Sequence, residues 1–207
     1  MDRQEYLNQI SATSQPKKKA GGKAGSFFSP KVLMIGAICL VLFVAMVVFG
    51  NVMSGSKGSE KDLAYTLKLH LDGTTSVISE YQELVKSSIL RSSSASLSSI
   101  LSNINRDLTA YITEKYNFEA EKVPENMAQQ AVLERDGLTQ DLFEAKINGN
   151  LDRIYAHKMT YEISLIANEE ANLINATNND KLKEVLKTSY DSLSNLYSDF
   201  NDFSETK

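Results

Sequence analysis

The sequence predicts an all-α protein in which a single N-terminal transmembrane helix precedes an antiparallel four-helix bundle. An uncharged, apolar run of 22 residues, from Val32 to Met53, predicts the transmembrane helix. Beyond it, apolar residues recur at helical spacing almost to the C-terminus, few segments resemble strands, and Pro124 is the only proline. We therefore expect a basic disordered segment (1–31), the anchor (32–53), a flexible linker (54–59) and the bundle (60–207).

The apolar run is long enough to cross a bilayer, because a helix rises about 1.5 Å per residue and the hydrocarbon core is about 30 Å thick. A cleaved signal peptide is the alternative, but its apolar region would span only about 7–15 residues after a short leader. A basic flank, Lys17–Lys31, precedes the run. The positive-inside rule then places the N-terminus in the cytoplasm and the C-terminal domain outside the cell membrane. We expect this flank to lie on anionic lipid head groups.

The charge of the chain is unevenly distributed. Residues 1–31 hold six Lys or Arg against two acidic residues, whereas residues 54–207 carry a net charge of −8. An acidic domain repels the phosphates of nucleic acids, so we expect no nucleic-acid partner. Cys39 is the only cysteine and lies within the apolar run, which excludes an intramolecular disulfide and a cysteine-based zinc site.

Two helices are expected in the first half of the bundle. The first runs from about Glu60 to Ser88, and Ser59 with Asp62 resembles a capping box at its start. The serine-rich run from Arg91 to Ser99 offers several N-cap residues, so we expect the chain to turn there. A second helix follows, with apolar residues from Leu97 to Ile112 at i, i+3, i+4 spacing.

The second half of the bundle is expected to contain two further long helices. Pro124 suits the first turn of a helix, and residues 124–147 are interpreted as one or two short extra helices interrupted near Asp136–Thr139. The turn signal Asn148–Asn150 precedes a third long helix, from about Leu151 to Ala176. The fourth runs from about Asp180 to Phe203 and is capped by the preceding Thr-Asn-Asn segment.

The third long helix carries charge on its apolar face. At about 100° per residue, Glu162 and Glu169 fall on the same face as Tyr155 and Met159. His157 falls on the opposite side, which predicts a solvated surface histidine. The spacing Glu-x-x-His of di-iron bundles is absent from the sequence.

A carboxylate on an apolar face must be paired or neutralised. One interpretation is an ion pair or hydrogen-bonded network with Lys158, one turn earlier, or with His70, which lies at the flank of the apolar stripe of the first helix. The alternative is a bound divalent cation, with Glu162, Glu169, Asp107 and His70 as candidate ligands converging from different helices.

The segment LDRIYAHKMTYEI resembles a motif of the bacterial DUF4142 family, Phe-Asp-x-x-Tyr-x-x-x-Met-x-x-Asp-His. Asp152, Tyr155 and Met159 match the motif, Glu162 stands at the family's acidic position, and Ile163 replaces the histidine. The resemblance extends over roughly residues 90–203. It implies a ferritin-like four-helix bundle that is exported or lies outside the membrane.

Two further segments resemble the same family. In LSSILSNINRDLT, Asp107 and Thr109 match, but Leu108 replaces a histidine; in LSNLYSDF, Asp199 stands in the place of another. All three histidines expected from the family are therefore replaced. The resemblance implies that any metal binding or catalysis which those histidines support in relatives is lost in this chain.

The sequence therefore predicts a membrane-anchored, extracytoplasmic helical bundle that is not an enzyme and has no cofactor. No pairing of a nucleophile with a base is recognisable, and His70 and His157 are the only histidines. We expect an interaction or envelope-structural module with a protein partner that the sequence does not identify. The alternative is a degenerate ferritin-like protein that binds a divalent cation in the bundle interior.

Overall fold

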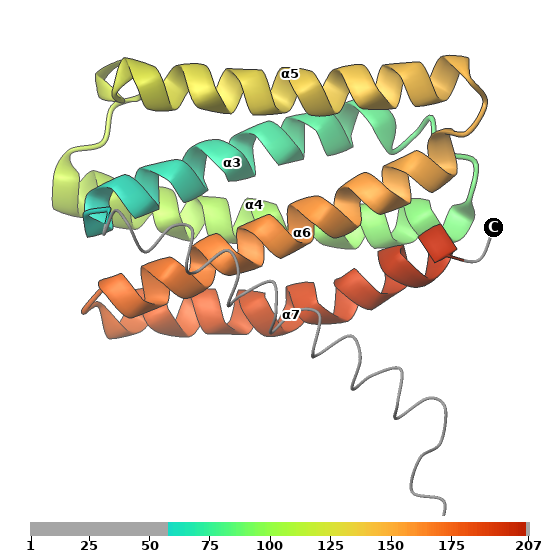
Figure 1. Ribbon diagram of the computed structural model, residues 1–207. Helices are drawn as coiled ribbons and strands as arrows, with labels where there is room; N and C mark the ends of the chain where they lie inside the picture. The colour runs from blue at the N-terminus through green and yellow to red at the C-terminus, as the bar shows by residue number, and fades with distance from the viewer. Residues whose placement is uncertain (1–57, 206–207) are drawn as a thin grey trace, which may run out of the picture. The chain divides into compact units, whose positions relative to one another are not determined.

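The computed structural model describes residues 58–205, with side chains as far as Phe203. This part of the chain contains five α-helices and one short 3-10 helix, and no strand (Figure 1). The all-α prediction is therefore confirmed for this region. The helices are α3 (Glu60–Tyr81), α4 (Ser88–Tyr116), α5 (Glu125–Ile147), α6 (Leu151–Ala176) and α7 (Asp180–Glu205), with η1 (Ala120–Lys122) before α5.

The predicted anchor, Val32–Met53, and the basic segment 1–31 lie outside the described residues. Most of the predicted linker, Ser54–Lys57, also lies outside them. Within residues 58–205, none of the helices combines the length and the apolar character needed to cross a bilayer.

Four of the helices form a closed bundle. α3 packs on α4, α4 on α7, α7 on α6, and α6 on α3. α3 and α7 run in one direction and α4 and α6 in the other, so neighbouring helices are antiparallel around the ring (Figure 1). α5 packs against α3 and α6 from outside this ring, and it carries the chain back along the bundle between α4 and α6.

One continuous apolar core fills the space between the helices. Each fully buried Leu, Ile or Phe side chain stabilises the fold by about 1.5–3 kcal/mol relative to its exposed state. Every long helix of the ring supplies several of these side chains. The largest of those that are almost inaccessible to solvent are Tyr155, Phe200, Leu67, Leu71, Ile78, Leu90, Leu97, Leu101, Leu108, Ile112, Leu142 and Met159.

Several predicted helix boundaries are confirmed. Ser59 accepts a hydrogen bond from the Asp62 backbone N–H at 3.2 Å, and the Asp62 side chain accepts one in return from the Ser59 backbone, as in a capping box. The side-chain oxygen of Asn179 accepts from the Leu182 N–H at 2.8 Å and so caps α7. Gly149, with φ +72°, forms the left-handed turn before α6.

The predicted turn between the first two helices is misplaced. α3 ends at Tyr81 rather than near Ser88, and α4 begins at Ser88 and continues through the serine-rich run. The cause lies on α6, where the Asp152 carboxylate accepts the backbone N–H groups of Lys86 and Ser87, both at 2.9 Å. These bonds prevent the connection from continuing α3 as a helix. The Ser87 side chain then accepts a hydrogen bond from the Leu90 N–H and so forms the N-cap of α4.

Two serines of α4 are compatible with a helix because their hydroxyls bond within it. The hydroxyl of Ser94, which is fully buried, donates to the Leu90 carbonyl at 2.6 Å, and that of Ser96 donates to the Ser92 carbonyl at 3.1 Å. Each hydroxyl is therefore satisfied by the carbonyl one turn earlier.

The segment before α6 is also simpler than predicted. α5 is a single helix of 23 residues rather than one or two short helices, and it is not interrupted at Asp136–Thr139. Gly137 lies within this helix with no atom close to the position that a Cβ would take. A single glycine costs a helix only about 1 kcal/mol relative to alanine, which the contacts of α5 with α3 and α6 offset.

Candidate functional site

The most distinctive polar cluster joins His70 of α3 to two glutamates of α6. The His70 Nε2 lies 2.7 Å from Glu162 Oε2, and its Nδ1 lies 3.0 Å from Glu169 Oε2. Both ring nitrogens therefore face a carboxylate, an arrangement in which a protonated imidazole donates both hydrogen bonds. The Thr74 hydroxyl, one turn further along α3, adds a longer hydrogen bond of 3.4 Å to the same oxygen of Glu162.

Helix geometry explains how these three side chains meet. Glu162 and Glu169 are seven residues apart, which is about two helical turns, so both lie on the same side of α6. α3 packs antiparallel on that side, with His70 between the two carboxylates. We call this set of three residues, His70, Glu162 and Glu169, the His–Glu triad.

The His–Glu triad holds its imidazole in the charged form. Burial alone would lower the pKa of His70, but the hydrogen bonds and negative charges of Glu162 and Glu169 outweigh it and raise that pKa to about 10. The side chains of His70 and Glu162 are 10% and 12% exposed and that of Glu169 is 24% exposed. The triad is therefore a largely buried ion cluster that is charged at neutral pH.

The sequence left open whether Glu162 is neutralised by Lys158 or by His70, and His70 is the partner. Lys158 instead forms an ion pair with Asp141 of α5. His157 is exposed on the opposite side of α6, as predicted.

Of the four candidate metal ligands, the structure brings together His70, Glu162 and Glu169 and leaves Asp107 elsewhere. Asp107 is on α4, pairs with the neighbouring Arg106 at 3.0 Å, and lines a groove between α4 and the start of α7. Within residues 58–205, no group of three or more His, Cys, Asp and Glu side chains has the arrangement needed to hold a metal ion.

The geometry of the imidazole explains why the His–Glu triad favours a proton over a metal ion. The two carboxylates lie at opposite nitrogens of one ring, so a single ion at either nitrogen would contact only one of them at bonding distance. A metal would also need the unprotonated ring, which the raised pKa of His70 disfavours. The triad is therefore suited to an electrostatic link between α3 and α6.

We predict that divalent cations do not stabilise the protein. Because His70 is held as an imidazolium by Glu162 and Glu169, added Zn²⁺, Mn²⁺ or Fe²⁺ should leave the unfolding temperature unchanged, as should prior treatment with a chelator. Differential scanning calorimetry and elemental analysis of the purified protein would measure this. A stoichiometric metal together with a rise in unfolding temperature would contradict the ion-cluster interpretation.

A small cavity adjoins the His–Glu triad beneath α5. Its volume is about 20 Å³, and His70, Glu162 and Thr74 line it together with Ala131, Arg135 and Leu138 of α5. This is room for about one water molecule. α5 therefore covers the outer side of the triad and leaves no space there for a larger ligand.

A second buried carboxylate, Glu170, follows Glu169 in α6 and was not among the predicted site residues. Glu170 is fully buried, and its Oε1 accepts a hydrogen bond from the Ser189 hydroxyl of α7 at 2.7 Å, while its Oε2 has no hydrogen-bond partner. Burial raises the pKa of Glu170 to about 8, against the lowering effect of the Ser189 hydrogen bond and with a smaller contribution from the charge of Glu169. The carboxyl group is therefore mostly protonated at neutral pH.

A signal for Glu170 was present in the sequence. Glu170 lies eight residues after Glu162, which is a rotation of about 80° around the helix axis. Its side chain therefore points in nearly the same direction as that of Met159. Ser189 interrupts the apolar stripe of α7 and is 5% exposed. A glutamate and a serine at facing positions of two predicted core stripes are a pattern that indicates a buried hydrogen bond.

Comparisons of the chain with family models, with curated proteins and with solved structures found no match.

Proposed function

We propose that this protein is a membrane-anchored, extracytoplasmic helical bundle that acts without catalysis, as an interaction or envelope-structural module. The proposal combines the uncharged run Val32–Met53 with the bundle that begins at Glu60, shortly after that run ends. The basic flank Lys17–Lys31 supports an orientation with the N-terminus in the cytoplasm and the bundle outside.

The observation that carries the non-catalytic part of the proposal is the His–Glu triad. General acid–base catalysis most often uses a histidine with a free nitrogen near neutral pH. His70 has both nitrogens bonded to carboxylates and a pKa raised to about 10. His70 therefore supports the packing of α3 on α6 rather than proton transfer to a substrate.

We further propose that the bundle is ferritin-like and related to the DUF4142 family. Two antiparallel pairs, α3 with α4 and α6 with α7, are joined by one long crossover through α5, which is the connectivity described for ferritin-like bundles. Leu108 and Ile163, which stand where the family has histidines, are buried in the apolar core. Asp199, at the third such place, accepts a hydrogen bond from Ser93 at 3.4 Å. These contacts support the loss of any histidine-based chemistry.

Protease treatment of intact cells tests the location and orientation. With tags at the two ends of the full chain, the C-terminal tag and the bundle should be degraded while the N-terminal tag stays protected. Permeabilised cells, in which both tags should be lost, are the control. Protection of the bundle together with loss of the N-terminal tag in intact cells would overturn the proposed orientation.

The alternative function is binding of a divalent cation by Glu162, Glu169 and His70. The contact among these three residues is the one observation in its favour. Their placement at opposite nitrogens of one ring favours the ion cluster, and the calorimetric experiment above separates the two functions.

A further inference from the structure

The helix α5 exposes apolar side chains to solvent. Of the seven large apolar side chains that are exposed in the part of the chain that the structure describes, four belong to this helix. They form two pairs along it: Val132 and Leu133 are 45% and 68% exposed, and Phe143 and Ile147 are 49% and 67% exposed. Exposed apolar groups that gather on one element are typical of interaction sites.

All four side chains lie on the side of α5 that faces away from the bundle. At about 100° per residue, they fall within about 100° of one another around the helix axis. The side chains that α5 buries lie on the opposite side of the axis, and they are Leu138, Leu142 and Ala145. α5 itself lies outside the four-helix ring (Figure 1). The exposed fractions show that no segment of residues 58–203 covers this side of the helix.

The charged residues on the same side of α5 are all acidic. Glu125, Asp136 and Glu144 fall in the same sector of the helix and are exposed, whereas Arg135 and Lys146 fall outside that sector. We call the seven residues of this sector the α5 outer face: Val132, Leu133, Phe143, Ile147, Glu125, Asp136 and Glu144.

Two of these carboxylates keep their charge without a cation beside them. Glu125 accepts a hydrogen bond from the Gln129 amide at 2.9 Å, and Glu144 accepts one from the Gln140 amide at 2.8 Å. Neither glutamate forms an ion pair within residues 58–205. A neutral amide satisfies a carboxylate oxygen but leaves its negative charge available to a partner.

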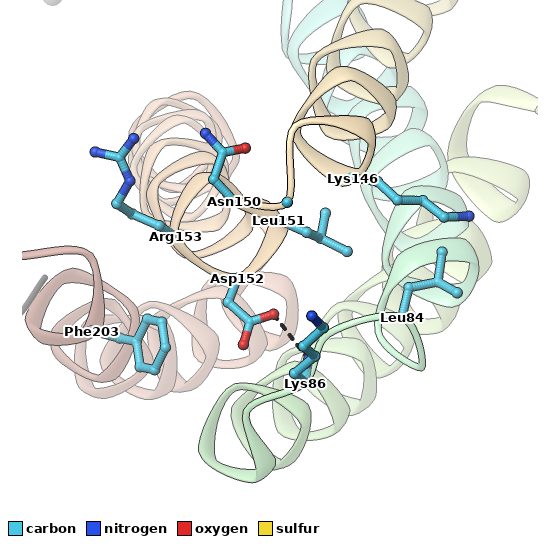
Figure 2. A pocket seen from close by; sticks show the side chains of 9 residues that line it. Leu84, Lys86, Lys146, Asn150, Leu151, Asp152, Arg153 and Phe203 are labelled. Atoms are coloured by element: carbon cyan, nitrogen blue, oxygen red, sulfur yellow. Dashed lines mark hydrogen bonds between the residues drawn. The ribbon is translucent and has the colours of Figure 1, made fainter.

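The uniform charge of the α5 outer face contrasts with that of the largest pocket. This pocket, of about 550 Å³, opens at the end of the bundle where α5 meets α6. Its cations Lys146 and Arg153 point away from each other on opposite sides of the opening, and Asp152 bonds to the Lys86 backbone between them (Figure 2). The pocket therefore presents no single sign of charge to a ligand, whereas the α5 outer face does.

Charge complementarity selects the occupant of the α5 outer face. A second copy of the same face would bring further carboxylates and no cation, and an anionic lipid surface would be repelled in the same way. A segment that combines apolar side chains with Lys or Arg matches both features of the face. Val132 and Phe143 are eleven residues apart, which is three turns or about 16 Å, so a helix with apolar residues at the same spacing would contact both pairs.

We propose that the α5 outer face binds a helical segment of another protein that carries two apolar anchors about three turns apart, with Lys or Arg side chains between and beside them. The anchors pack on the two apolar pairs, and the cations lie near Asp136, Glu125 and Glu144. This proposal rests on the interaction role proposed above and names the chemistry of the partner. It does not depend on the orientation of the protein in a membrane.

Photo-crosslinking of the full-length protein in zwitterionic nanodiscs tests this inference. The probe is a helical, alanine-based peptide of about 18 residues with leucines at the spacing of the four apolar residues of α5 and lysines between them. One leucine is replaced by its diazirine analogue, and mass spectrometry locates the cross-links. They are expected on residues 125–147 and should be displaced by the same peptide without the diazirine.

Two further peptides separate charge from spacing without any change to the protein. A peptide with glutamate in place of every lysine should cross-link at least tenfold less, because like charges then face each other. A peptide of the same composition, in which the two leucine pairs are one turn apart, should also cross-link at least tenfold less, because only one pair can then contact the face.

Variants of the apolar pairs test the face itself. Leu133→Gln with Phe143→Gln should reduce cross-linking about tenfold, because each apolar pair loses one contact with its anchor. The matched control, Leu84→Gln with Ile89→Gln, changes two exposed apolar residues elsewhere and should cross-link normally. All four side chains are exposed, so the circular dichroism spectra should be unchanged.

Variants of the acidic residues test the charge. Glu125→Gln with Glu144→Gln should reduce cross-linking about fivefold, since two exposed ion pairs with the probe are lost. Glu114→Gln with Glu184→Gln makes the same change in net charge at exposed positions of α4 and α7, and should have no effect.

Three results would overturn the proposal: equal cross-linking by the glutamate peptide or by the closely spaced peptide, cross-links spread over acidic surfaces of α4 and α7, or a face variant that cross-links like its matched control. A dimer of the peptide-free protein that Leu133→Gln with Phe143→Gln dissociates would also overturn it, since a second copy would then be the occupant. None of these results alters the outcome of the protease experiment, so the two proposals fail separately.

Discussion

Replacing His70 with leucine should lower the free energy of unfolding by about 3–5 kcal/mol, because the change leaves the carboxylates of Glu162 and Glu169 without their cation. A carboxylate that lies in a partly buried site without a cationic partner raises the free energy of the folded state. Urea unfolding of the purified protein, followed by circular dichroism, would measure the difference.

The chain provides a matched control for this experiment. His157 is exposed on the far side of α6, and His157→Leu should change the stability by less than about 0.5 kcal/mol. The double variant His70→Leu with Glu162→Leu should recover part of the loss, since the more buried carboxylate is then removed together with its partner. Equal effects of the two single histidine substitutions would rule out a stabilising role for the triad.

The His–Glu triad also predicts a pH dependence. The pKa of His70 is raised to about 10 in the folded protein, above its ordinary value of 6.5. The folded state therefore holds the proton more tightly than the unfolded chain does, and the stabilisation is fully present below about pH 6.5. It should be lost as the pH rises through about 10, and this loss should be absent from the His70→Leu variant.

Replacing Glu170 with glutamine should remove a separate pH dependence at lower pH. The pKa of Glu170 is raised from 4.5 to about 8, so the folded protein keeps a proton that the unfolded chain has released. Stability should consequently fall as the pH rises from about 4.5 to about 8, and should level off above that range. In Glu170→Gln this slope should vanish, because the amide is neutral throughout and its oxygen still accepts from Ser189.

Above pH 8 the Glu170→Gln variant should be more stable than the native protein, by on the order of 3–5 kcal/mol. Urea unfolding at a series of pH values would measure both effects, and the range from about pH 4.5 to about pH 5.5 isolates Glu170 because His70 is largely protonated in both states there. Glu184→Gln, which changes an exposed residue of α7, should keep the native slope. A native slope in the Glu170→Gln variant would show that Glu170 is ionised in the folded protein.

The sequence predicted α6 and two of its inward carboxylates, Glu162 and Glu169, because this helix is long, uninterrupted and apolar on one side, but it did not single out the buried Glu170. The observed bounds, Leu151–Ala176, are those expected. The pairing of Glu162 with His70 was one of two alternatives, since the sequence does not specify which neighbouring helix faces α6. That choice depends on the tertiary arrangement, in which α3 packs on α6 and Lys158 faces Asp141 of α5.

The boundary between α3 and α4 could not be predicted, because its cause is remote in the sequence. Lys86 and Ser87 are held by Asp152, which is 66 and 65 residues away. Serine has a modest helix propensity, so a run of serines resembles a turn when tertiary contacts are ignored. In α4 the fully buried Ser94 bonds to the Leu90 carbonyl one turn earlier, which makes the same residues compatible with a helix.

The position of α5 outside the four-helix ring has a consequence for hydrogen exchange. Its buried side chains, Leu138, Leu142 and Ala145, all belong to its second half, and none belongs to residues 125–137. Segments with few buried contacts open at a lower free energy than the rest of a fold. The amides of the first half of α5 should therefore exchange faster than those of α4 or α6. Because Ala131 and Arg135 line the cavity beside His70, each such opening admits solvent to the triad while the four-helix ring stays closed.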